Sequence, residues 1–226
     1  MSVSSALFRL HRAMILVFAG IVVTVEVTVV PIITNFTDLG FSFWLGLAGS
    51  AAKYWTLVLG IMLVSGHLKV FVTNGYTRRA FAAGATVFVT IVAAGVAAVV
   101  TLGHWLESTV VVALGEAASD YPVLTGGGLP GEFGRVFPVS LAWAVTGALI
   151  ALGFYRFGGW RGLIAMVPAA LPAAVSEGLV AINERGLSAD LLPYLIEVLI
   201  SLTVTVFGLA VFGLLTRGVA IRRTAG

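Results

Sequence analysis

The chain contains no cysteine and little charge. None of its 226 residues is Cys, and only 10% are Asp, Glu, Lys or Arg. Without cysteine, a disulfide framework, a thiol nucleophile and a thiolate metal site are excluded. The scarcity of charge leaves too little polar surface for a water-soluble globule, since 59% of the residues are hydrophobic and the mean hydropathy is +1.07. The composition therefore predicts a membrane protein.

Acidic residues are absent from the places where basic residues gather. Ten of the thirteen Lys and Arg flank hydrophobic stretches at ends that hold no Asp or Glu. These are Arg9, Arg12, Lys69, Arg78, Arg79, Arg156, Arg161, Arg217, Arg222 and Arg223. Because Lys and Arg are retained on the cytoplasmic side of a membrane, the pattern predicts that both termini are cytoplasmic. The basic residues form no stripe with interleaved aromatics, so we expect no nucleic-acid partner.

Six stretches are long enough to cross a bilayer as helices. A hydrocarbon core of roughly 30 Å requires about 20 helical residues. The predicted fold class is therefore all-α, a single polytopic domain with six transmembrane helices. The helices are expected at residues 13–34, 51–72, 80–102, 136–157, 162–182 and 191–215. The preference for Arg, Ala, Val and Gly is typical of a GC-rich bacterial genome, so we expect a multi-pass protein of the bacterial plasma (inner) membrane.

One predicted connection on the outer side is long. Residues 103–135 are expected to form an external loop, because the apolar stretch Trp105–Leu114 is too short to cross the membrane. We expect this stretch to lie at the outer interface as a short helix anchored by Trp105. The glycines at 126–128 predict a flexible turn. They are no phosphate cradle, since the chain has no GxxxxGK motif.

Three carboxyl groups are expected inside the membrane. Counted from the predicted cytoplasmic ends, Glu26, Glu177 and Glu197 fall in the outer halves of their helices. A charge in hydrocarbon costs several kcal/mol unless it is paired or hydrated, so all three are candidate pathway or coupling residues that could line one outward-facing vestibule. Alternatively, Glu197 is interfacial and Glu26 is a protonated carboxyl bonded to a neighbouring helix. Pro168 and Pro172 predict a bend in the helix of Glu177.

Patterns for catalysis and metal binding are also missing. His11 and His67 are expected near the inner membrane face and His104 near the outer one, so the three cannot bind one metal. No HExxH motif, nucleophile elbow or P-loop is present. We therefore expect no cofactor and no catalytic activity in this chain.

The predicted connection between the second and third helices carries an ordered motif, VTNGYTRRAF at residues 72–81. Asn74 and Gly75 predict a tight turn, and Thr77 can cap the following helix. Arg78 and Arg79 place two charges at the membrane surface. A capped helical hairpin with inward arginines would account for these residue types by itself.

In its residue order this segment resembles the cytosolic joint of ABC-2-type ABC transporter permeases. The residues that carry the likeness are Asn74, Gly75, Thr77, Arg78, Arg79 and Phe81. The resemblance implies that these residues couple to a separate cytoplasmic ATP-binding subunit, which would bring ATP and Mg²⁺. It also implies a second copy of the chain or a homologous permease, surrounded by membrane lipids. The chain differs from the family in its short segment before the first helix and in placing its largest external loop after the third.

The resemblance implies a transport subunit of an ATP-driven exporter that moves an amphipathic or hydrophobic solute, such as a peptide, lipid or antibiotic. Two alternatives stay open. One is a stand-alone secondary transporter or substrate-binding membrane subunit in which Glu177, with Glu26 or Glu197, exchanges protons or captures a cation. The other is a non-transporting membrane scaffold packed through its many small residues.

Overall fold

The computed structural model describes residues 2–34, 40–184 and 194–219; for Glu26, Val30, Thr34 and residues 181–184 the backbone alone is described. Every regular element of these residues is helical. Six helical segments are long and apolar enough to cross a membrane. The all-α prediction with six membrane-spanning helices is therefore confirmed, and by helix length and composition the chain is a multi-pass membrane protein.

The elements are long helices joined by short connections. They are α1 (Val3–Thr34), η1 (Leu45–Gly49), α2 (Ser50–Met62), η2 (Leu63–Leu68), α3 (Lys69–Thr73), α4 (Arg78–Leu114), η3 (Gly126–Gly128), α5 (Leu129–Phe157), α6 (Gly159–Ala169), α7 (Leu171–Glu184) and α8 (Tyr194–Arg217). Elements η1 and η2 are π-helical, and the second membrane span runs without a break from Leu45 to Thr73. The fifth span, Gly159–Val180, consists of α6 and most of α7.

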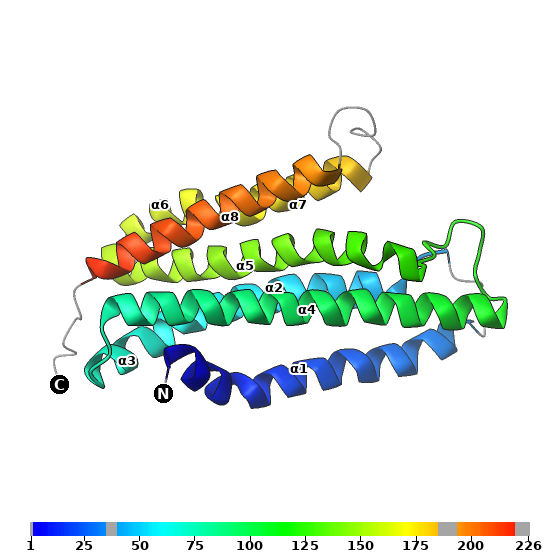
Figure 1. Ribbon diagram of the computed structural model, residues 1–226, viewed down its shortest axis with the longest axis horizontal. Coiled ribbons are helices and arrows are strands. Elements are labelled where there is room, and N and C mark those ends of the chain that lie inside the picture. Colours follow the sequence, from blue (N-terminus) through cyan, green and yellow to red (C-terminus); the bar gives the residue numbers. More distant parts are fainter. Residues whose placement is uncertain (1, 35–39, 185–193, 220–226) are drawn as a thin grey trace.

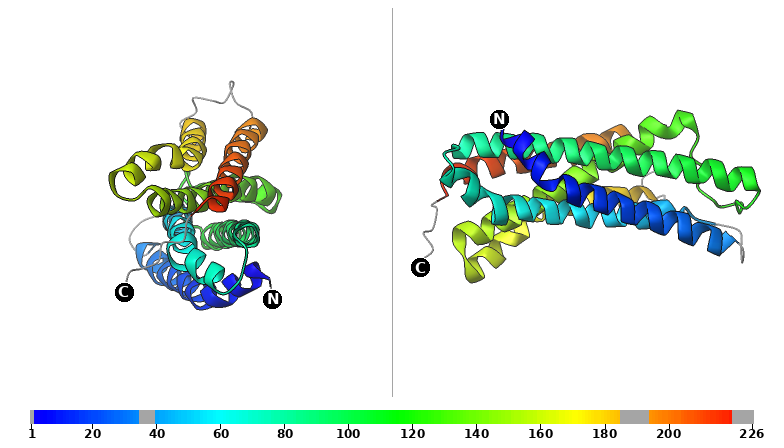
Figure 2. Two further views of the ribbon diagram at one scale, coloured as in Figure 1. Left: turned by 90° about the vertical axis from the view of Figure 1, so that its left-hand side faces the viewer. Right: turned by 90° about the horizontal axis from the view of Figure 1, so that it is seen from below.

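The spans run along one long axis, with α5 in the middle of the bundle (Figure 1 and Figure 2). On one side α5 packs against α2 and α4, and on the other against α6, α7 and α8. Helix α1 lies on the outside of this arrangement, where only 6% of its most apolar window is buried, compared with 78% for the span of α5. Helix α1 begins and α8 ends at the same end of the bundle, here called the terminal end (Figure 1). The opposite end is called the distal end.

Helices α2 and α5 approach closely because both carry glycine at their contact. A methyl group at Gly60 would overlap the carbonyl oxygen of Ala144, and one at Gly147 would overlap that of Leu57. Small residues permit this kind of approach between membrane helices, where apolar packing replaces the hydrophobic effect. The centre of the bundle is therefore fixed by direct contact between two backbones.

The connection between the third and fourth spans is much shorter than the external loop expected at residues 103–135. Helix α4 continues to Leu114, and α5 already begins at Leu129. The predicted loop boundaries are therefore wrong. The separate interfacial helix expected from Trp105 is also wrong, since that stretch continues α4.

The physical reason is that nothing interrupts α4 before its end. Gly103 remains helical, and the ring of Trp44 packs where a Cβ at that position would stand. The helix stops at Gly115, whose φ of +75° is a left-handed conformation that favours glycine. The glycines at 126–128 form the 3₁₀ turn η3, which leads directly into α5.

Two further features concern helix ends. Helix α1 begins at Val3 instead of residue 13, and the hydroxyl of Ser2 accepts a hydrogen bond from the Ser5 amide at 3.3 Å. This is the bond expected of a helix-capping serine. The bend predicted from Pro168 and Pro172 is confirmed, since α6 ends and α7 begins between these two residues.

Candidate functional site

The turn at residues 74–77 joins α3 to α4 at the terminal end. Gly75 has φ +88°, and the side-chain amide of Asn74 donates to the Val70 carbonyl at 2.8 Å. The Thr77 hydroxyl accepts a hydrogen bond from the Ala80 amide at 3.1 Å, as an N-capping residue does. The predicted Asn-Gly turn and threonine cap are therefore confirmed.

The residues that follow the turn fix it to the bundle. Phe81 is fully buried, with its ring centroid 5.7 Å from that of Phe71. Arg79 is exposed, whereas Arg78 is half-buried and its Nε has no hydrogen-bond partner among the described residues. The guanidinium group of Arg79 is therefore exposed at the start of a helix that is capped by Thr77 and packed through Phe81.

The terminal end as a whole is basic. The described segments that form it, residues 2–12, 69–81, 154–163 and 213–219, contain no Asp or Glu. Its cations are Arg9, Arg12, Lys69, Arg78, Arg79, Arg156, Arg161 and Arg217. Arg222 and Arg223 lie outside the described residues. This end therefore carries excess positive charge.

Two histidines meet near the terminal end. The Nε2 atoms of His11 and His67 are 3.3 Å apart, and the His11 Nδ1 is 2.9 Å from the Leu7 carbonyl oxygen. His104 lies on the distal part of α4 and is not part of this pair. No group of three or more His, Cys, Asp or Glu among the described side chains could hold a metal ion.

Glu177 on α7 is half-buried and paired with a lysine of another helix. Its Oε1 lies 2.5 Å from the Lys53 ammonium, and its Oε2 accepts a hydrogen bond from the Trp143 indole at 3.3 Å. The pair joins α7 to α2, and the Trp143 bond adds α5. Pairing satisfies the requirement that a charge within a membrane span be compensated.

The helices that carry the other two predicted carboxyl residues, α1 and α8, lie on different sides of the bundle (Figure 1). Glu197 is buried on α8, next to α7, and the hydroxyls of Ser176 and Ser201 share a 2.5 Å hydrogen bond between these helices. Helix α1, which carries Glu26, lies across the α2, α4 and α5 layer from α7 and α8 (Figure 1 and Figure 2). The side chain of Glu26 is outside the described atoms. The structure thus brings the helices of Glu177 and Glu197 together and keeps α1 apart from them.

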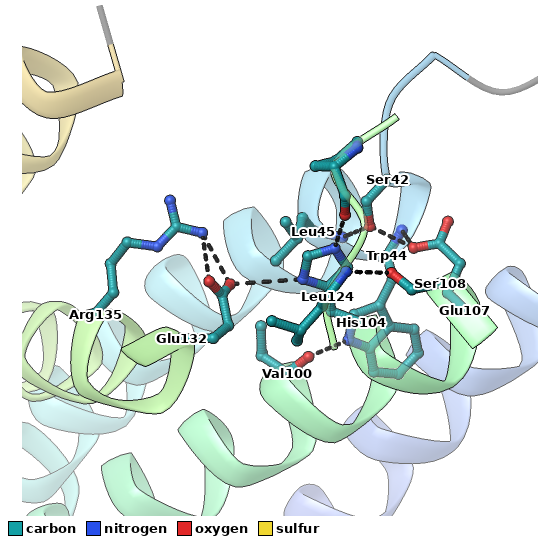
Figure 3. Close-up of polar contacts among 11 residues, drawn as sticks. Ser42, Trp44, Leu45, Val100, His104, Glu107, Ser108, Leu124, Glu132 and Arg135 are labelled. Atoms are coloured by element: carbon teal, nitrogen blue, oxygen red, sulfur yellow. Dashed lines mark hydrogen bonds and ion pairs between the residues drawn. The ribbon is translucent and has the colours of Figure 1, made fainter. Parts of the chain in front are cut away.

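Glu107 on α4 caps the start of the second span. Its carboxylate accepts hydrogen bonds from the Ser42 hydroxyl and from the Trp44 amide, the latter at 3.3 Å (Figure 3). It also accepts one from the Phe43 amide at 2.9 Å. The Trp44 indole in turn donates to the Val100 carbonyl at 2.8 Å. A carboxylate is favoured here because the first amides of a helix lack partners and carry partial positive charge. Glu107 therefore holds the second span against α4.

His104, one turn earlier on α4, faces an ion pair on α5. Its Nε2 lies 2.9 Å from the Pro122 carbonyl, which can only accept, so Nε2 carries the hydrogen. Its Nδ1 lies 3.8 Å from the Glu132 carboxylate, which accepts two hydrogen bonds from Arg135 at 2.8 and 3.0 Å (Figure 3). A histidine, a carboxylate and a guanidinium thus meet at the distal end.

The segment between α4 and α5 is also fixed to α4. The Leu124 amide donates to the Ser108 hydroxyl at 3.0 Å. Tyr121 is buried beside Val111, and this burial raises the pKa of its phenol to about 12. These contacts hold the segment over the polar cluster of His104 and Glu132.

A cavity of about 510 Å³ opens among these elements. Its polar lining includes Lys53, His104, Glu132 and Arg135, and its apolar walls come from η1, α4, the segment after α4, α5 and α7. At 1.5 Å per residue, His104 lies about 39 Å along α4 from Arg78, and a bilayer core is roughly 30 Å thick. The cavity is therefore near the membrane boundary opposite the terminal end.

Sequence reasoning missed the residues of this cavity. Glu132, Arg135 and His104 fall within the external loop that the sequence predicts at residues 103–135. One signal was present in the sequence: Glu132 and Arg135 are spaced i, i+3, as in a helical ion pair. Lys53, alone within a hydrophobic stretch, was a second signal, since such a charge requires a partner.

Comparison with known proteins finds no match: no family model, no curated protein and no solved structure matches the chain.

Proposed function

We propose that the chain is the transmembrane permease subunit of an ATP-driven exporter of the ABC-2 type. The observation that carries this proposal is the segment at residues 74–81, in which the turn at residues 74–77 leads into the start of α4. It is capped by Thr77, anchored by the buried Phe81, and exposes Arg79 at the terminal end. A partner that pushes on this turn would move α4 directly, because α4 begins at Arg78.

Helix α4 links this turn to the cavity. It runs unbroken for 37 residues from Arg78 to Leu114, and it carries His104 and Glu107 at the distal end. A helix transmits displacement along its axis because its backbone hydrogen bonds resist compression. Movement of the turn would thus shift one wall of the cavity relative to α5, which carries Glu132 and Arg135, as alternating access requires.

The energy would come from a separate subunit. The chain has no P-loop, so ATP and Mg²⁺ would bind to a cytoplasmic ATPase that docks at the terminal end. The positive charge of that end suits a partner that presents negative charge. We place the termini in the cytoplasm of a bacterium and the spans in its plasma membrane, where a second copy or a homologous permease would complete the pathway.

The test asks whether the two arginines after the turn are needed for the permease to stimulate ATP hydrolysis by its ATPase. The full chain is purified with its native ATPase and reconstituted in vesicles, and ATP hydrolysis is compared for the wild type and the Arg78→Ala/Arg79→Ala variant. We expect hydrolysis stimulated by the permease to fall about tenfold, equivalent to roughly 1.4 kcal/mol of coupling. Arg161→Ala is the matched control, since it removes a cation of the same end outside the turn. Equal stimulation by all three proteins would contradict the proposal, as would purification without any ATPase.

The Lys53–Glu177 pair favours one second candidate, a proton-coupled carrier that works without ATP. Protonation of the Glu177 carboxylate would break its ion pair with Lys53. Such a step would couple transport to a pH gradient. Glu177→Gln should then abolish pH-driven uptake into vesicles, whereas an ATP-driven exporter would show no such uptake before or after the substitution.

A further inference from the structure

The Lys, Arg and Glu side chains that line the cavity at the distal end are all paired within the described part of the chain. Lys53 is paired with Glu177, and Arg135 is paired with Glu132. A ligand of one net charge would leave this half-buried site charged, and an uncompensated buried charge is costly. A zwitterion preserves the balance, because each of its charges meets its opposite on the wall.

His104 indicates which cation the site accepts. The side chain is 4% exposed, its Nε2 hydrogen is committed to Pro122, and its buried Nδ1 has no hydrogen-bond partner among the described residues. In the neutral ring Nδ1 is an acceptor. It lies 3.8 Å from Glu132 Oε1, too far for a direct hydrogen bond. One nitrogen donor between them could bond to both, since each bond spans about 2.9 Å.

These two acceptors fit a primary ammonium group. Such a group carries three N–H donors and a positive charge, so it can satisfy His104 Nδ1 and remain close to the Glu132 carboxylate. A quaternary ammonium carries the same charge and has no N–H donor. The site should therefore distinguish between these two cations.

Lys53 provides the place for an anion. Only one of its three N–H donors is used by Glu177, and its side chain is 28% exposed at the cavity. A phosphate or carboxylate can accept the remaining donors. The pairing with Glu177 holds the ammonium group in position for this.

The position and walls of the cavity indicate an amphiphile. The depth along α4 places the polar residues near the headgroup level of a bilayer. Val100, Val136 and Val139 also line the cavity and can contact an apolar chain. Polar groups at one level and apolar walls beside them match a molecule with a zwitterionic head and a hydrocarbon tail.

We propose that this cavity binds the zwitterionic head of an amphiphile that carries a primary ammonium and an anionic group, as an ethanolamine phospholipid does. As a statement about the exported solute, the proposal rests on the proposed function; as a statement about binding, it is tested without any ATPase. The same head chemistry could come from a membrane lipid or from a soluble molecule.

The test measures lipid retention by the full chain. The protein is purified from nanodiscs that contain equal amounts of phosphatidylethanolamine, phosphatidylcholine and phosphatidylglycerol, and bound lipid is counted by native mass spectrometry. We expect phosphatidylethanolamine to be retained about tenfold over the other two, consistent with one charge-assisted hydrogen bond. Phosphatidylcholine keeps the phosphate and loses the N–H donors, while phosphatidylglycerol loses the cation. Equal retention of the three lipids would overturn the proposal.

Two further arms identify the source and the residues. Displacement of the lipid by soluble phosphoethanolamine would show that the head alone is sufficient, whereas retention would show that the acyl chains are needed; either result supports the shared chemistry. His104→Gln keeps a donor for Pro122 and removes the Nδ1 acceptor, and Glu132→Gln removes the carboxylate charge. Both should abolish the preference for phosphatidylethanolamine.

Asp120→Asn is the matched control, because it removes a carboxylate of the same end outside the cavity lining. Should Glu132→Gln fail to fold, His104→Gln still tests the site. A folded His104→Gln protein with undiminished preference would contradict the assignment. Loss of lipid preference with ATPase coupling intact would leave the proposed function standing, and failure of the Arg78→Ala/Arg79→Ala test would leave the binding site standing.

Discussion

The terminal end and the distal end of the bundle differ in how their charges are arranged. At the terminal end, Arg79 is exposed on a capped turn, and the surrounding segments contain no acidic residue. At the distal end, Glu107 is almost fully buried and bonded to backbone amides, and Glu132 is paired with Arg135. Exposed charge of one sign is suited to reversible binding of a partner. Buried charge of both signs instead fixes the helices to one another.

Helix α4 takes part in both arrangements. Its first residue, Arg78, directly follows the turn, and Glu107 near its other end holds the second span. A substitution on α4 should therefore affect stability at the distal end and partner coupling at the terminal end. The following substitutions test this division.

Glu107→Ala should have the largest effect on stability. It leaves the Ser42 hydroxyl and the amides of Phe43 and Trp44 without their acceptor, and we expect a loss of about 3 kcal/mol in the free energy of unfolding. Thermal unfolding in detergent measures this. Asp120→Ala removes an exposed carboxylate of the same end and should change stability by less than about 0.5 kcal/mol. Equal midpoints for the two variants would show that Glu107 is not structural.

Gly103→Ala should have the second largest effect. The added methyl group would overlap the Trp44 ring, and the resulting overpacking should cost about 1–3 kcal/mol. Gly95→Ala on the same helix is the control, because nothing lies near its Cβ position. That variant should gain up to about 1 kcal/mol, since alanine favours helix. The difference between the two unfolding midpoints measures how tightly the distal end is packed.

Thr77→Ala should have a smaller effect, at the terminal end. It removes the hydroxyl that accepts from the Ala80 amide, a capping bond worth about 1 kcal/mol. Thr73→Ala removes a hydroxyl that donates to carbonyls of its own helix, so it should be nearly neutral. The two are compared by thermal unfolding, and a larger loss for Thr73→Ala would contradict the cap.

The sequence was informative where the determining interactions are local. The six spans follow from the length and hydropathy of continuous stretches, and the turn follows from Asn74, Gly75 and Thr77, whose partners are three or four residues away. The distal end depends on distant pairs. Glu107 binds residues more than sixty positions earlier, and Lys53 and Glu177 are separated by 124 positions.

The misplaced loop at residues 103–135 has the same origin. A prediction from hydropathy and helix length assumes that a helix ends where the membrane ends. Helix α4 continues past that point because Trp44 packs at Gly103 and the Glu107 carboxylate has partners on another segment. Neither contact can be read from the run of residues itself. The cytoplasmic orientation of the termini stays a prediction from the arginine pattern.

Arg79→Ala should have the smallest effect on stability and still alter coupling. The side chain is exposed and outside the cap, so the free energy of unfolding should change by less than about 0.5 kcal/mol. Exposed charges are screened by salt, with a Debye length of about 10 Å at 0.1 M and about 3 Å at 1 M. Association of the wild type with its ATPase should therefore weaken as salt rises, and Arg79→Ala should lose part of that dependence. Retention of phosphatidylethanolamine at the distal end should be the same in both proteins at every salt concentration. The reason is that the charged side chains of the cavity are half-buried and paired. A salt dependence at the cavity equal to that at the turn would mean that the two ends do not differ as their geometry indicates.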